Sequence, residues 1–138
     1  MIALIWMAAA SDVEAYLRRL DRTYEKVGTD TFVVVLGPSQ PPAVVKLSPP
    51  VLVARVDVAD APQQKPELEA KLFRRLLELN ATELVYVAFG IDSGRIVLDA
   101  ALELTTLDLN ELDAVLAGLD LAIAQQVAPL RELVKASQ

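Results

Sequence analysis

Asp113 and Asp120 are the acidic side chains whose spacing comes nearest to a catalytic pair, because two turns of a helix put both carboxylates on one face. Solvated acids share a helix face just as readily, and a general acid–base pair also needs a pocket that shifts its pKa values. The sequence contains neither histidine nor cysteine, which removes the commonest general base, the thiol nucleophile and the usual zinc ligands. We therefore expect a protein that is not an enzyme, with no catalytic residue, no cofactor and no metal site.

Three short motifs resemble functional sites but lack the residues that would complete them. The tripeptide Asp-Ser-Gly at 92–94 has no further acidic ligands for a calcium loop, so it favours a hairpin turn. Gly90 and Gly94 are not followed by the third glycine or the Gly-Lys-Ser/Thr of a phosphate-binding loop. Asn80 opens an Asn-Ala-Thr glycosylation triplet, although nothing else in the sequence indicates a secreted glycoprotein.

The composition favours a single domain over residues 1–138 that leaves apolar surface for a partner. A chain of 138 residues is long enough to bury a core, and 54% apolar residues is high for a soluble domain. The net charge of −6 disfavours binding both to nucleic acid and to anionic membranes. We expect a cytoplasmic protein whose partner is another protein, with no nucleic-acid and no membrane partner.

Residues 1–10 form an apolar arm that includes Trp6. No basic residue precedes Ser11, as a secretory signal would require, and the arm is too short to cross a bilayer as a helix. We expect the arm to pack on the domain or on a second subunit.

Both flanking helices have predicted caps. Ser11 and Glu14 have the spacing of a capping box at the start of the first helix, and Asp108 is the predicted cap of the last. Pro129 should end or kink that last helix, because proline lacks the N–H that the helix needs. Residues 129–138 are therefore predicted as a short tail that continues the helix or frays.

The centre of the chain predicts a helix followed by a two-stranded hairpin. Pro66 suits the first position of a helix, and leucines recur at helical spacing from there to Leu79. Asn80 indicates the helix stop, because Asn tolerates the left-handed conformation. A strand over residues 84–89 then leads into a second strand over residues 95–104, where apolar and charged residues alternate.

Three more strands are predicted before the central helix, over residues 31–36, 43–47 and 51–58. The loops between them are short and rich in proline, so these strands should be antiparallel neighbours. The resulting order is α-β-β-β-α-β-β-α. It predicts an α+β domain with an antiparallel sheet of about five strands and helices packed on one face.

Several local motifs support a family assignment. Leu79-Asn80 precedes a strand that ends in Phe89-Gly90, and an apolar strand then leads to Leu-Asp-Leu-Asn-Glu-Leu at 107–112. Tyr24 follows the amphipathic first helix. This pattern, over about residues 12–129, resembles type III secretion chaperones, the Tir-chaperone or YbjN-like group. The motifs are structural and none is catalytic. The resemblance implies a small acidic homodimer that holds a partly unfolded segment of a client protein on apolar surface.

The predicted protein-binding residues are Val33, Val35, Val51, Val53 and Trp6. The four valines alternate away from the predicted core, at positions where a sheet with one solvated face should be polar. Either this face receives a client, or both faces are covered, by helices on one side and by a second subunit or the arm on the other. The function predicted first is a non-enzymatic protein-binding module of the secretion-chaperone type. The alternative is a small regulatory or structural subunit that binds one folded partner.

Overall fold

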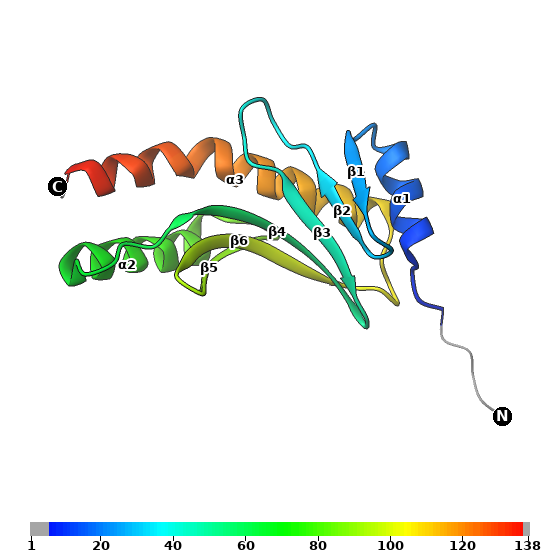
Figure 1. The fold of residues 1–138 in the computed structure, drawn as a ribbon, viewed down its shortest axis with the longest axis horizontal. Coiled ribbons are helices and arrows are strands. Elements are labelled where there is room, and N and C mark those ends of the chain that lie inside the picture. The colour runs from blue at the N-terminus through cyan, green and yellow to red at the C-terminus, as the bar shows by residue number, and fades with distance from the viewer. Residues whose placement is uncertain (1–5, 137–138) are drawn as a thin grey trace.

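A computed structural model describes residues 6–136 of the chain (Figure 1). Its elements, in order, are α1 (Ala10–Arg19), β1 (Tyr24–Val27), β2 (Thr31–Val34), β3 (Ala43–Ser48), β4 (Val51–Asp60), α2 (Pro66–Thr82), β5 (Ala88–Asp92), β6 (Arg95–Glu103) and α3 (Leu109–Ala136). Helix α3 runs along the molecule, while α1 lies beside β1 at one end and α2 lies at the other (Figure 1). No helix of the described chain is long and apolar enough to cross a membrane.

The strands form one six-stranded sheet in the order β1-β2-β3-β4-β6-β5, with every pair antiparallel. The predicted α+β class and antiparallel sheet are confirmed. Helix α2 and strand β5 lie between β4 and β6 in the sequence, but in the sheet β4 pairs directly with β6 over almost its whole length. Strand β5 is therefore an edge strand, and β1 is the other edge.

Strand β1 is absent from the sequence prediction, which had one strand fewer. Its four residues include the adjacent charges Glu25 and Lys26, and three of the four are exposed, so it carries no alternating apolar pattern. Pairing with β2 creates this strand. The rings of Tyr24 and Phe32 contact edge to face, with 5.9 Å between their centroids. The Lys26 amine lies 6.0 Å from the centroid of the Phe32 ring.

Alternate residues of the strands bury their side chains against the helices. In β2, β3 and β4 these are Phe32, Val34, Ala43, Val45, Leu47, Leu52, Ala54 and Val56. They join the buried side chains of α3, which are Leu112, Val115, Leu116, Leu119, Ala122, Ile123 and Leu130, in one core. The helices therefore cover one face of the sheet, as the period-two pattern predicts. We call the other face the open face.

The two predicted caps have different outcomes. Helix α1 begins at Ala10, one residue before the predicted cap Ser11, so that cap is wrong. The reason is that Asp12 accepts a hydrogen bond of 2.8 Å from the backbone N–H of Ala9, which fixes the first turn one residue earlier. The predicted cap Asp108 is confirmed, since its Oδ1 accepts a 2.8 Å bond from the N–H of Glu111.

Helix α3 continues through Pro129 to Ala136, so Pro129 does not end it, and the tail continues the helix, which is one of the two predicted outcomes. Proline costs the helix a hydrogen bond. Leu130 is buried directly after it, and Val134 packs partly buried against the core one turn later. Apolar contacts on the far side of the proline thus offset the loss.

Asn80 does not end its helix. Helix α2 continues to Thr82, and the Asn80 amide instead makes two hydrogen bonds to the backbone of Phe89, accepting from its N–H at 2.7 Å and donating to its C=O at 3.0 Å. Strand β5 correspondingly begins at Ala88, not at residue 84. Tyr86 adopts a φ of 71°, which no strand accommodates, so the chain before β5 is a loop.

Candidate protein-binding surface

The predicted valines lie together on the open face. Val33, Val51 and Val53 are half-buried, and Val35, directly after β2, is 50% exposed. Val33 pairs across the sheet with Val44 of β3, which is 41% exposed and shares this face. We call Val33, Val35, Val44, Val51 and Val53 the valine patch. It spans three neighbouring strands, and no helix within residues 6–136 packs on it.

Sequence reasoning missed Val44. Alternation along residues 43–47 could have found it, because Ala43, Val45 and Leu47 are buried and the residues between them must face the other way. Lys46 occupies the next such position and lies opposite Val53. Lys46 therefore borders the centre of the valine patch, as does Arg55 of β4, which lies opposite Val44.

A network of ion pairs occupies the half of the open face beyond the valine patch. Arg55 of β4 donates to Asp99 Oδ2 through Nε at 3.0 Å and through Nη2 at 2.7 Å, and to Asp92 Oδ2 through Nη1 at 2.6 Å. Hydrogen bonds to Asp99 and then to Asp92 raise the pKa of the Arg55 guanidinium. The bond from Arg55, followed by one from Ser93, lowers the pKa of the Asp92 carboxyl from its ordinary value of 3.8. The Asp92 carboxyl is therefore held in its charged form.

A second arginine repeats this arrangement nearer the hairpin turn. Arg95 of β6 bonds Asp57 at 2.7 Å and also contacts Asp60. The hydrogen bond to Asp57, followed by that to Asp60, raises the pKa of the Arg95 guanidinium. Pairs this exposed contribute little stability, because water screens their charges. Their effect is to divide the open face into an apolar half on β2–β4 and an ionic half on β4–β6–β5.

Trp6 is exposed, and it lies in the described part of the predicted arm. Ala8 is buried, and its N–H donates to the carbonyl of Leu104 at 2.9 Å. The N–H of Leu104 in turn donates to the carbonyl of Pro50, also at 2.9 Å. The arm therefore joins the domain at the same end of the sheet as Val51. The first five residues of the arm lie outside the described residues.

A second exposed apolar group lies outside the five predicted protein-binding residues. Val85, Tyr86 and Leu121 line a shallow cavity of about 230 Å³ between the loop before β5 and helix α3. Tyr86 is 67% exposed. Gly118 of α3 permits the close approach, because a Cβ there would lie 3.0 Å from the carbonyl oxygen of Val85. We call Val85, Tyr86 and Leu121 the loop cluster.

Solved structures with this fold include chains of secretion complexes. A chain of the heterodimeric complex ExoU–SpcU from the type III secretion system of Pseudomonas aeruginosa superposes with a TM-score of 0.65, at 21% identity, over 86% of this chain and 96% of that chain. A chain in the structure of the Yersinia pestis type III secretion chaperone SycH with a fragment of YscM2 gives 0.56, at 15% identity, over 88% and 98%. YbjN, a putative transcription regulator from E. coli, gives 0.56, at 10% identity, over 89% and 96%.

These identities are low enough that the similarities show the fold alone. No curated protein matches the chain in sequence. The family model CesT_Tir_1, in contrast, matches residues 7–136, which include every helix and strand of the structure. The chain therefore belongs to the CesT_Tir_1 family of type III secretion chaperones.

Proposed function

We propose that this protein is a non-enzymatic chaperone-like module that holds a segment of a client protein on the open face of its sheet. The observation that carries the proposal is the valine patch, an apolar surface on three neighbouring strands that no helix of residues 6–136 covers. The family supports it, because the solved complexes with this fold include a chaperone bound to a fragment of another protein. We also propose that the protein is cytoplasmic, as secretion chaperones are.

The chemistry of the described residues agrees with a binding role. No polar or charged side chain is buried within residues 6–136, so no desolvated acid or base is available there for catalysis. Covering a valine fully stabilises a complex by about 1.5–3 kcal/mol. Several half-exposed valines together can therefore hold an extended or helical segment without any covalent step.

Charges around the patch select the kind of client. Acidic side chains outnumber basic ones on the open face: Glu25, Asp57, Asp92, Asp99 and Glu103 share it with Lys46, Arg55 and Arg95. The chain as a whole carries a net charge of −6. An apolar segment flanked by basic residues fits this surface, and salt should slow its association because exposed charges are screened.

The double variant Val33→Asp/Val53→Asp is expected to abolish client binding while the domain stays folded. Both positions are half-buried on the open face. A bound client would have to strip water from a carboxylate there and place apolar side chains against it, which costs binding free energy. The measurement is co-purification from the source organism with tagged protein, followed by calorimetric titration of the segment identified. Circular dichroism and thermal melting check that the fold survives.

The matched control is Val33→Thr/Val53→Thr, which keeps the β-branched shape without adding charge. It should lose less affinity than the aspartate pair. Equal binding by wild type and the folded aspartate variant would place the client elsewhere. The partner could instead be a protein that is already folded and contributes no extended segment. That result would favour the alternative function, a small regulatory or structural subunit. If the aspartate variant unfolds, the valines belong to a covered interface and the client surface is refuted.

We further propose that the protein is a homodimer and that the loop cluster contributes to its interface. Light scattering over a concentration series should give twice the chain mass of 15.0 kDa. Tyr86→Asp should shift the dimer to monomer, because it puts a charge at the most exposed of the three side chains. Aspartate tolerates the positive φ at this position, so the loop itself should keep its shape.

Val27→Asp is the control for that variant, because Val27 is also an exposed apolar residue but lies on β1, the edge strand farthest from β5 and the loop cluster. It should leave the mass unchanged. A mass of 15.0 kDa at every concentration of the wild type would rule out the dimer.

A further inference from the structure

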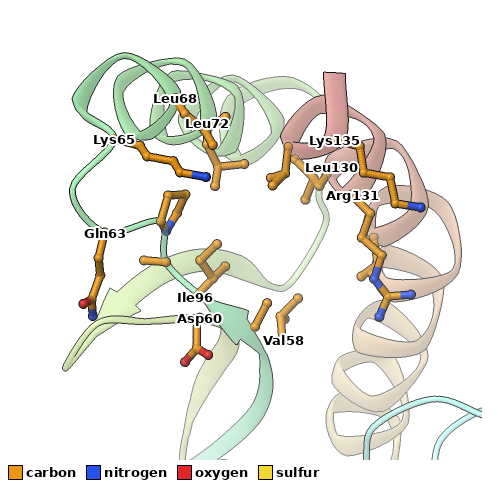
Figure 2. Close-up of a pocket in the computed structure, with 15 residues that line it drawn as sticks. Val58, Asp60, Gln63, Lys65, Leu68, Leu72, Ile96, Leu130, Arg131 and Lys135 are labelled. Atoms are coloured by element: carbon orange, nitrogen blue, oxygen red, sulfur yellow. The ribbon is translucent and has the colours of Figure 1, made fainter. Parts of the chain in front are cut away.

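A well-formed apolar cavity lies on the helix side of the sheet, away from the valine patch. It has a volume of about 420 Å³ and is enclosed by the end of β4, the linker into α2, the first turns of α2 and the last turns of α3 (Figure 2). Its walls are apolar side chains from four segments: Val58, Ile96, Leu68, Leu72, Leu130 and Val134. Cavities of this size and character accommodate small apolar ligands.

Basic side chains border this cavity although the protein is acidic. Lys65 precedes α2, and its side chain turns toward the cavity beside Leu72 (Figure 2). Arg131 of α3 lies on the opposite wall. Neither side chain has an ion-pair partner within residues 6–136, whereas Arg55 and Arg95 of the open face each have two. Asp60, the one acid in the lining, points away from the cavity (Figure 2).

We propose that the cavity binds a single-chain amphiphilic anion of the fatty-acid type. The hydrocarbon chain fills the space between α2 and α3, and the carboxylate lies at the mouth between Lys65 and Arg131. Charge complementarity favours this ligand, because Lys65 and Arg131, which have no ion-pair partner in the described chain, line a mainly apolar cavity. The net charge of −6 disfavours the alternative source of the same headgroup, an anionic bilayer, which would repel the whole protein.

The test is calorimetric titration of the full chain with sodium dodecanoate below its critical micelle concentration. We expect one saturable site, with decanoate binding about tenfold more weakly because two methylenes are lost. The variant Lys65→Gln/Arg131→Gln should bind dodecanoate about tenfold more weakly than the wild type. Its affinity for dodecyl maltoside, which is uncharged, should stay the same. Both replaced side chains are exposed, so the variant should fold.

The matched control is Arg19→Gln/Arg74→Gln, which removes the same charge from exposed positions on α1 and α2 and should bind dodecanoate like the wild type. Val134→Trp should fill the cavity and abolish binding, with circular dichroism as the check on folding. Three results would overturn the proposal: no saturable binding; equal affinity in the Lys65/Arg131 variant and the wild type; or sedimentation with phosphatidylglycerol vesicles when free dodecanoate does not bind. If the wild type does not bind dodecanoate and Val134→Trp changes the particle mass in solution, the cavity would be an interface with a second copy of the chain. That result would also refute the proposal.

Discussion

Leu98→Ala is expected to lower the free energy of unfolding by about 2–5 kcal/mol. Leu98 is fully buried near the middle of β6, where it pairs with Val56 of β4 on one side and Phe89 of β5 on the other. Truncation leaves a cavity between the sheet and the helices. Chemical denaturation followed by circular dichroism measures the change.

Leu77→Ala is the matched control, because it makes the same chemical change at a leucine that is 69% exposed on α2. Its free energy of unfolding should stay within about 0.5 kcal/mol of the wild type. A loss below 1 kcal/mol for Leu98→Ala would contradict the packing of β6 between β4 and β5. A large loss for Leu77→Ala would instead mean that a second subunit covers α2.

The long strands could be predicted from the sequence because apolar and polar residues alternate along each strand, and this pattern alone indicates which side chains are buried. Alternation in β4 and β6 places apolar residues on one face regardless of what the rest of the chain does. The elements that were missed depend on contacts from outside. Strand β1 exists because β2 pairs with it, and the last turns of α3 persist beyond Pro129 because Leu130 is buried.

The same distinction explains what the sequence could say about the binding surface. Alternation along β2 and β4 was enough to predict that Val33 and Val53 lie on one face of the sheet. The pairing of β3 with both strands adds Val44 and completes the valine patch. The loop cluster could not be predicted in this way. Its exposure follows from the positive φ of Tyr86 and from the close approach to Gly118, neither of which leaves a periodic signal.

Asn80→Ala is expected to lower the free energy of unfolding by about 1–3 kcal/mol. The Asn80 amide bonds both the N–H and the C=O of Phe89, which are the groups that an edge strand would otherwise leave to solvent. Without the amide, the strand loses its link to α2. Hydrogen exchange at the Phe89 N–H should accelerate more than exchange in β4, because the loss is local to β5.

Two variants separate this role from helix propensity. Asn110→Ala changes the same residue type at an exposed position in the first turn of α3, and it should leave stability within about 0.5 kcal/mol of the wild type. Asn80→Asp keeps an acceptor for the Phe89 N–H but turns a carboxylate toward the Phe89 carbonyl, so it should destabilise β5 as well. If Asn80→Ala were as stable as the wild type and exchange at Phe89 did not change, the bidentate contact would not hold β5 to α2, and burial of the Phe89 side chain alone would account for the docking of that strand.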